Sequence, residues 1–160
     1  KNHDFLLKVF AEIVHEREDA HLVLIGKGEL EEIIKKQANH LGILDKISFL
    51  GESSNVNKLI NVFDVGVFPS LFEGFSIAMV EMQVNGLPLV VSDNVPSEIN
   101  LTDNIRFLSL DETVKYWCKT ILETKGRDTG AVDKIIAKGY NLSDMVNKLT
   151  KTYERIVDKS

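Results

Sequence analysis

The sequence predicts an α/β fold in which helices pack on both faces of a parallel sheet, a doubly wound arrangement. The first observation is that short apolar runs, typical of buried strands, alternate with longer segments of helical periodicity. The second is size, because 160 residues with 44% hydrophobic side chains suit one domain with a real core. The sequence contains no internal repeat and no low-complexity segment, so we expect a single domain over residues 1–160.

Five short runs are predicted to be strands because they are apolar and rich in β-branched residues. They are His21 to Ile25, Ile47 to Leu50, Val65 to Phe68, Leu89 to Ser92 and Ile105 to Leu108. In open sheets of this class, ligands bind beyond the carboxyl ends of the strands. The loops that follow the five runs are therefore the places to look for a site.

Helical periodicity predicts the segments that connect the strands. They are the start of the chain to about Glu16, then Glu29 to Leu41, Val56 to Asn61, Ser76 to Val84, Thr113 to Leu122 and Ala131 to Lys138. Trp117 falls on an apolar helix face, so we expect it in the core. A last helix, with Ser143 as its predicted N-cap, carries the apolar stripe Met145, Val146, Leu149, Tyr153 and Ile156. An exposed stripe of this kind favours a homodimer.

Composition argues against several classes of function. The formal net charge is −5 and no basic face is concentrated in the sequence, which argues against nucleic acid as a partner. No apolar run of about eighteen residues occurs and no signal peptide is recognisable, so we expect no membrane span. Cys118 is the only cysteine, which excludes an internal disulfide and a multi-cysteine metal site. These features favour a cytoplasmic location.

The stretch from Pro69 to Glu81 has the pattern of a tight turn followed by a helix, directly after an apolar strand. Gly74 permits a sharp bend and the close approach of a ligand, and Ser76 is placed to cap the helix. Backbone N–H groups from Gly74 to Ile77 would then be free to bind an anion. The sequence therefore predicts an anion site at this turn.

Two carboxylates flank the turn. Glu73 and Glu81 are eight positions apart, and with a helix that begins near Ser76 the second lies about one and a half turns along it. Carboxylate oxygens are acceptors suited to sugar hydroxyls. An anion site beside such a carboxylate predicts a nucleotide or a sugar phosphate as the ligand.

These residues resemble the donor-binding signature of the family 4 retaining glycosyltransferases. The resemblance rests on the two glutamates, on Pro69-Ser70 before them, and on Asn85 to Pro88 with the apolar strand that follows. It extends upstream through the turn Gly26 to Gly28 and covers most of the chain. It implies the C-terminal, nucleotide-sugar-binding half of a larger two-domain GT-B enzyme, a Rossmann-like domain.

The resemblance also implies a missing element. The first strand of such a domain is normally central in the sheet, and here the chain begins at Lys1, after the position of that strand. We therefore expect the five remaining strands to close the gap in one sheet or to accept a strand from a neighbour.

The resemblance implies roles for the residues of the turn. Glu73 would be the catalytic carboxylate that contacts the donor sugar, and Glu81 would bind the ribose hydroxyls. The backbone amides of the turn would hold the departing diphosphate. The turn residues concerned are Gly74, Phe75, Ser76 and Ile77.

Two residues outside the turn complete the implied substrate site. Lys1 aligns with a lysine that contacts the diphosphate, with a solvated terminus as the alternative, and Gly26 would lie beside the nucleotide. The base would rest near Phe49 to Glu52 against backbone groups, while the side chains of Phe49 and Leu50 are expected in the core. No metal ion or other cofactor is implied, because a helix N-terminus would stabilise the leaving group.

The implied function is transfer of a hexose from a nucleotide-sugar, with a UDP-sugar as the expected donor. The acceptor would be a polysaccharide or a lipid-linked glycan, bound through the missing N-terminal domain, so this fragment alone is not expected to catalyse transfer. The segment Ser92 to Glu98 and the pair Tyr116-Trp117 are most similar to the exopolysaccharide branch of the family. That similarity favours exopolysaccharide or capsular biosynthesis, by a full-length enzyme in the cytoplasm or on the cytoplasmic face of the membrane.

Other chemistries fit the residues less well. The segment Gly74 to Ala78 nearly matches the nucleophile elbow of α/β-hydrolases, but that triad needs a histidine after the serine. All four histidines precede it, and they are too scattered for a metal set: His3, His15, His21 and His40. The turn Gly26 to Gly28 lacks the spacing of a Walker loop. A phosphoacceptor receiver domain would need an acidic pair after its first strand, and this sequence lacks such a pair. A nucleotide-sugar epimerase on a GT-B scaffold, or a nucleotide-binding module without turnover, stay as alternatives.

Overall fold

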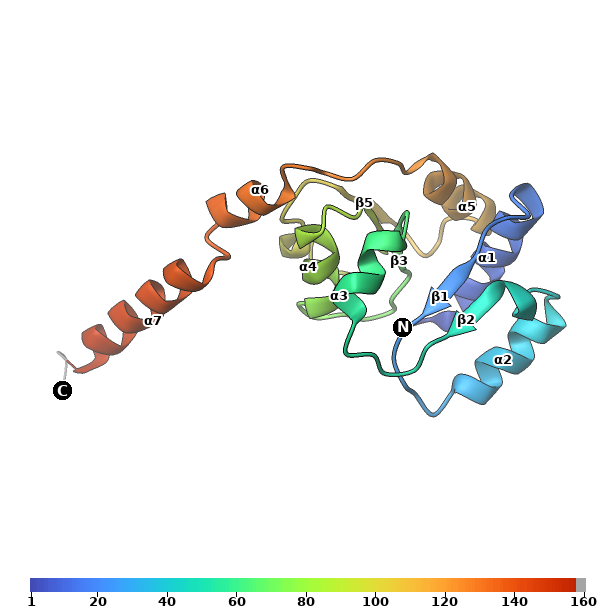
Figure 1. Ribbon diagram of the computed structural model, residues 1–160, viewed down its shortest axis with the longest axis horizontal. Helices are drawn as coiled ribbons and strands as arrows, with labels where there is room; N and C mark the ends of the chain where they lie inside the picture. Colours follow the sequence, from blue (N-terminus) through green and yellow to red (C-terminus); the bar gives the residue numbers. More distant parts are fainter. Residues whose placement is uncertain (158–160) are drawn as a thin grey trace.

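The computed structural model describes residues 1–157, apart from the side chains of Leu142, Met145, Ile156 and Val157. It contains five strands, and every strand pair is parallel. Strand β1 (Leu22–Leu24) pairs with β2 (Ile47–Phe49). Strand β4 (Leu89–Ser92) lies between β3 (Gly66–Phe68) and β5 (Ile105–Leu108). Figure 1 shows the two groups of strands and the helices around them.

The alternative in which the five strands close the gap in one sheet is wrong, because they form a two-stranded and a three-stranded sheet. Within the described residues, β1 and β3 each pair on one side only, so the expected gap is not closed by a hydrogen-bonded ladder. Side-chain packing joins the two sheets instead. A larger hydrophobic cluster contains Ile47 from the first sheet and Val90 from the second, and Leu22 and Val67 pack against it.

Helices cover this larger cluster. Helix α1 (His3–Glu16) packs against α5 (Val114–Glu123), and α2 (Glu31–His40) completes the layer. Trp117 is fully buried as predicted, and its indole N–H donates a 2.9 Å hydrogen bond to the carbonyl of Ser109. Phe5 meets the Trp117 ring edge to face at a centroid distance of 5.4 Å.

Strand β4 separates the larger cluster from a smaller one on its other face. Val90 belongs to the larger cluster, whereas Leu89 and Val91 pack with Met79 of helix α4 (Ile77–Val84). This alternation is the two-residue period of a strand with apolar cover on both faces. It explains why all four residues of β4 are buried, and it confirms the doubly wound α/β class.

Short helices fill the connections. They are η1 (Leu44–Lys46), α3 (Val56–Leu59), η2 (Ile60–Val62) and η3 (Ser97–Ile99). The side chain of Arg127 holds η2 in place, donating to the carbonyls of Ile60 and Phe63 at 2.7 and 2.6 Å. It also donates to Asn85 at the end of α4. One guanidinium therefore satisfies carbonyls at the ends of two helical segments.

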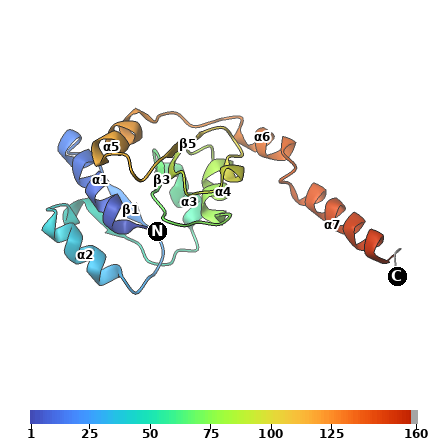
Figure 2. The same ribbon diagram turned by 180° about the vertical axis from the view of Figure 1, so that it is seen from behind.

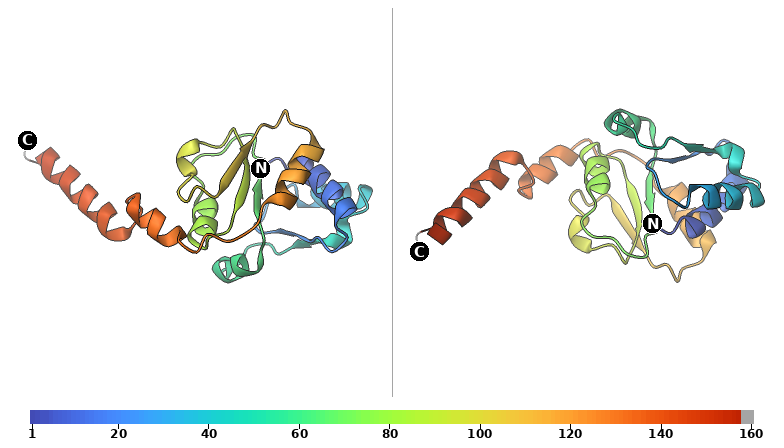
Figure 3. Two further views of the ribbon diagram at one scale, coloured as in Figure 1. Left: turned by 90° about the horizontal axis from the view of Figure 1, so that it is seen from above. Right: turned by 90° about the horizontal axis from the view of Figure 1, so that it is seen from below.

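Helix α6 (Ala131–Ala137) packs against α4 and buries Ala131 and Ile135. Helix α7 (Leu142–Val157) extends away from the sheets in all four ribbon views (Figures 1, 2 and 3). The predicted Ser143 cap of α7 is wrong. Asn141 accepts from the backbone N–H of Asp144 at 2.9 Å and donates to its carboxylate at 2.6 Å, a reciprocal capping pair at the required three-residue spacing.

The predicted apolar stripe on α7 is only partly described. Val146, Leu149 and Tyr153 are exposed, while the side chains of Met145 and Ile156 lie outside the described residues. Across residues 1–157, no helix combines the length and the apolar character needed to cross a membrane.

Candidate functional site

The predicted turn lies between β3 and α4, at the carboxyl end of the three-stranded sheet. Close packing brings the two elements together at Gly66, where a Cβ atom would lie 2.5 Å from Leu89 Cδ2 and 2.8 Å from Met82 Sδ. No larger side chain fits there without movement of its neighbours. The path of the chain into the turn is therefore fixed by a glycine that the sequence analysis did not single out.

Backbone donors gather after this strand. Helix α4 begins at Ile77 as predicted, and Ser76 is its N-cap in extended conformation, with φ −82° and ψ 114°. The expectation that the Ser76 side chain caps the helix is wrong, because it makes no cap hydrogen bond. In the described part of the chain, the backbone N–H groups of residues 74–79 donate to no protein acceptor. These donors at a helix start form a suitable anion site.

Glu73 stands at the start of this turn, with a side chain that is 12% exposed. Its Oε2 accepts from the Nζ of Lys1 at 2.5 Å and from the hydroxyl of Ser70 at 3.2 Å. The structure thus brings Lys1 and Glu73 together across 72 positions of sequence. The Lys1 side chain is 57% exposed, and its ammonium forms this ion pair beside the turn.

Glu81 lies on the second turn of α4 and is exposed. Among residues 1–157, its carboxylate has no hydrogen bond and no ion pair. Its acceptor oxygens are therefore free for a ligand. The structure places Glu81 on the helix that starts at the turn, but records no contact between it and Glu73.

A second feature lies at the carboxyl end of the two-stranded sheet. Gly26 has φ +122°, and its N–H donates at 2.7 Å to the carbonyl of Gly51, which has φ +61°. An open hollow of about 750 Å³ adjoins these two turns. It is lined by Lys27, Gly28, Glu29, Glu31, Phe49, Leu50 and Gly51.

Of the two side chains expected in the core at the end of β2, the structure buries one in part and exposes the other beside the hollow. Phe49 packs partly against the larger cluster, as expected of a core residue. Leu50 is 43% exposed and lines the hollow, so its placement in the core is wrong. The reason is that Leu50 follows the last paired residue of β2, and the chain turns at Gly51 before the side chain can be covered.

Two serines near the turn have a structural role that the sequence analysis did not predict. Ser70 follows β3 and Ser92 ends β4, and both are fully buried. The hydroxyl of Ser92 donates to the carbonyl of Ser70 at 2.5 Å. A serine at the end of an otherwise apolar buried strand is the signal that could have identified them, since a buried hydroxyl requires a partner.

His3 is partly buried at the start of α1, two positions after Lys1. Burial lowers the pKa of His3, and the positive charges of the terminal amine and Lys1 lower it further. No group of three or more histidine, cysteine or acidic residues with metal-binding geometry occurs in the part of the chain that the structure describes.

Comparison with known proteins gives consistent matches. Residues 1–108 match the family model described as Glycosyl transferases group 1. EpsF of Bacillus subtilis (strain 168), a protein named as a glycosyltransferase, is 33% identical over 164 residues, covering 99% of this chain and 43% of EpsF.

Solved structures show the same fold. TarM of S. aureus, solved with Fondaparinux, alpha-GlcNAc-glycerol and UDP, has a TM-score of 0.78 and 19% identity over 94% of this chain and 32% of TarM. The pneumococcal O-GlcNAc transferase GtfA, in complex with UDP and GlcNAc, has a TM-score of 0.74 and 20% identity over 98% of this chain and 33% of GtfA. The chain therefore spans less than half the length of these proteins.

Proposed function

The chain belongs to the group 1 glycosyltransferase family, a family of enzymes that transfer sugars, and we propose that it is the nucleotide-sugar-binding domain of such an enzyme. The observation that carries this proposal is the arrangement at the end of β3. Unpaired backbone N–H groups at residues 74–79 adjoin the Lys1–Glu73 ion pair, so donors for an anion and a carboxylate for hydroxyls lie side by side.

The proposed donor is a UDP-sugar. The structures of TarM and GtfA contain UDP, which supports a uridine nucleotide as the ligand of this fold. In this chain, the diphosphate would bind the amides of Gly74, Phe75, Ser76 and Ile77 together with Lys1. Glu81 would accept hydrogen bonds from the ribose. The base would enter the hollow beside Gly26 and Gly51.

The same geometry suggests how the domain would assist transfer. As the bond between the sugar and the diphosphate breaks, negative charge grows on the diphosphate oxygen that leaves. The amides at the start of α4 and the ammonium of Lys1 would stabilise that charge. Glu73 would contact the hydroxyls of the sugar and hold it in position. In this proposal no metal ion is needed.

The proposal for the whole protein goes further than this chain. We infer that residues 1–160 form one donor-binding domain of a two-domain enzyme, and that the acceptor, a polysaccharide or lipid-linked glycan, binds the other domain. This fragment alone would then bind the donor without transferring its sugar. Biosynthesis of exopolysaccharide or capsule at the cytoplasmic face of the membrane is the process that we propose for it.

The test is a titration of the ¹⁵N-labelled chain with UDP, UDP-glucose and GDP, followed by NMR. We expect shifts in the amides of Gly74 to Ile77 and of Glu81, with a Kd of about 0.1 to 1 mM. UDP should bind more tightly than GDP. Glu81→Gln should weaken UDP binding, whereas the control Glu98→Gln, on exposed η3, should not. Absence of shifts at residues 74–81 with every nucleotide would refute the proposed site.

A further inference from the structure

Glu73 is held by a chain of buried hydroxyls that starts on another strand. Ser92, the last residue of β4, donates from its hydroxyl to the carbonyl of Ser70 at 2.5 Å. The hydroxyl of Ser70 donates to Glu73 Oε2 at 3.2 Å. Both serines are fully buried, so each hydroxyl depends on its protein partner. The carboxylate is thus linked through two hydrogen bonds to the central strand of the three-stranded sheet.

The two donors to Glu73 differ in charge and exposure. Lys1 carries a full positive charge and its side chain is 57% exposed, whereas Ser70 is neutral and buried. An incoming diphosphate attracts the ammonium of Lys1 but exerts little force on a buried hydroxyl. When a donor binds, Lys1 is therefore free to turn toward the phosphates, while the Ser70 hydrogen bond stays in place.

The same contacts leave one carboxylate oxygen available. Lys1 and Ser70 both donate to Oε2, and within the described residues Oε1 of Glu73 accepts no hydrogen bond. A carboxylate offers about four lone-pair positions on its two oxygens. Oε1 is the natural acceptor for a sugar hydroxyl, provided that the carboxylate does not rotate.

We propose that Ser70 is a positioning residue that keeps Glu73 oriented toward the donor sugar after Lys1 has moved to the diphosphate, and that Ser92 fixes Ser70 by binding its carbonyl. This inference rests on the proposed function, because it assigns Glu73 to the sugar. It goes beyond that function by naming two buried residues that never touch the ligand. It also predicts which part of the donor each change affects: the sugar, and not the nucleotide.

The experiment compares UDP with UDP-glucose, UDP-galactose and UDP-GlcNAc on Ser70→Ala and the unaltered chain, by the same NMR titration. For the UDP-sugar that binds the unaltered chain most tightly, we expect Ser70→Ala to raise the ratio of its Kd to the Kd of UDP about fivefold. The Kd of UDP itself should stay within about twofold. In a Glu73→Ala background, which lacks the acceptor, Ser70→Ala should add no further change, since the two residues act through one contact.

A second readout needs no ligand. The ¹³Cδ resonance of Glu73 should shift in Ser70→Ala and, to a smaller extent, in Ser92→Ala, which keeps the Ser70 hydroxyl. The control Ser97→Ala removes an exposed serine of η3 and should leave the resonance unchanged. If Ser70→Ala fails to fold, Ser92→Ala provides both readouts in its place.

The outcomes separate the two proposals. If no nucleotide binds the unaltered chain, the proposed function fails, and the ¹³Cδ shift still tests the contact between Ser70 and Glu73. Unchanged ¹³Cδ resonances in both serine variants would overturn the positioning role. So would an equal loss of affinity for UDP and the UDP-sugar, because that result indicates only a general structural effect.

Discussion

The central strand of the three-stranded sheet is more deeply buried than either strand of the two-stranded sheet. Every residue of β4 is buried, and the three-stranded sheet lies between two hydrophobic clusters. In the two-stranded sheet all of β1 and most of β2 are only partly covered, and the loops that follow turn at glycines with positive φ. The sheet with the fully buried central strand carries the turn with Glu73, and the other sheet borders the open hollow.

This difference suggests that one sheet gives the turn a rigid support, while the other borders a region that can adjust. In the proposed function, the groups at the turn would meet a diphosphate and a sugar at fixed distances, and they would gain from a rigid support because small displacements weaken such contacts. A hollow that would receive a base through backbone groups tolerates more adjustment. The comparison therefore predicts that substitutions of residues packed against the three-stranded sheet lower the free energy of unfolding. Comparable substitutions beside the hollow should change it little.

The largest effect is expected at Gln83, a fully buried side chain of α4. Its amide donates to the carbonyls of Met79 and Ile99 at 3.2 and 2.9 Å. Its oxygen accepts from the Leu101 N–H and the Thr102 hydroxyl at 2.9 and 3.3 Å. Gln83→Leu keeps the volume but leaves these groups unpaired, so we expect a loss of about 2 to 4 kcal/mol in the free energy of unfolding.

Urea denaturation measures this loss. The matched control is Gln37→Leu in α2, where a partly exposed side chain makes one hydrogen bond of 3.2 Å to Asp4. There we expect a change below about 0.5 kcal/mol. Equal losses in the free energy of unfolding for Gln83→Leu and Gln37→Leu would contradict the predicted difference between the two parts of the domain.

A pair of glycines tests the comparison more directly. Gly66→Ala places a Cβ atom into contact with Leu89 and Met82, and we expect it to destabilise the fold by about 1 to 3 kcal/mol. Gly28→Ala, beside the hollow, meets nothing within 4 Å, and we expect a change within about 0.5 kcal/mol. Thermal unfolding of both variants gives the measurement. A large loss at Gly28 would mean that the hollow is as tightly constrained as the sheet.

A smaller effect on stability is expected when the pH is lowered, because His3 at the start of α1 becomes protonated. The pKa of His3 is lowered in the folded state, chiefly by burial, so the fold prefers the neutral ring. Its contribution to stability is complete above the unfolded pKa of about 6.5 and is lost as the pH falls through the lower folded value. His3→Gln should therefore lose less stability than the unaltered chain between pH 7 and pH 5, measured by urea midpoints. A steeper loss in the variant would contradict this sign.

Much of the fold follows from local pattern. Helix α1 ends at Glu16 and α4 begins at Ile77, close to the predicted bounds, because apolar spacing marks both helices and Gly74 marks the turn before α4. The division into two sheets does not follow, since apolar periodicity indicates that a segment is a strand but not which edge it pairs with. The cap of α7 is a similar case. Asn141 and Ser143 can both cap a helix, and the spacing to Asp144 decides between them.

The site was predictable in its residues but not in its contacts. The turn, the two glutamates and Lys1 could be named from the motif. The ion pair between Lys1 and Glu73 joins residues 72 positions apart, and only the fold determines that distance. The serine chain behind Glu73 depends on strand register, which brings the ends of β3 and β4 together. Burial of a serine is a property of that packing and not of its sequence neighbours.

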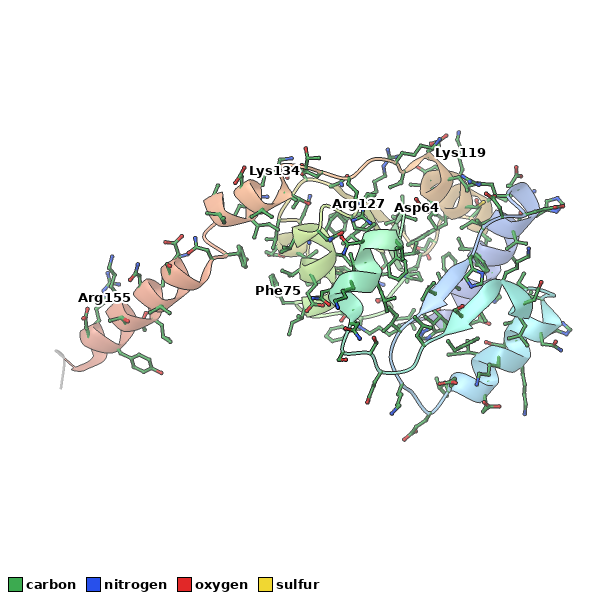
Figure 4. The ribbon with its side chains drawn as sticks, viewed as in Figure 1. Asp64, Phe75, Lys119, Arg127, Lys134 and Arg155 are labelled. Atoms are coloured by element: carbon green, nitrogen blue, oxygen red, sulfur yellow. The ribbon has the colours of Figure 1, made fainter. Side chains whose placement is uncertain are left out.

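The protruding C-terminal helix α7 affects how the molecule moves through water. Helix α7 has 16 residues, which corresponds to about 24 Å of length beyond the body of the domain. Phe75 of the turn stacks on Tyr140, which precedes α7, at a centroid distance of 5.9 Å, and Figure 4 shows Phe75 on the side of α4 that faces these helices. Friction rises with length more than with mass, so the chain should sediment and diffuse more slowly than a sphere of 18.0 kDa.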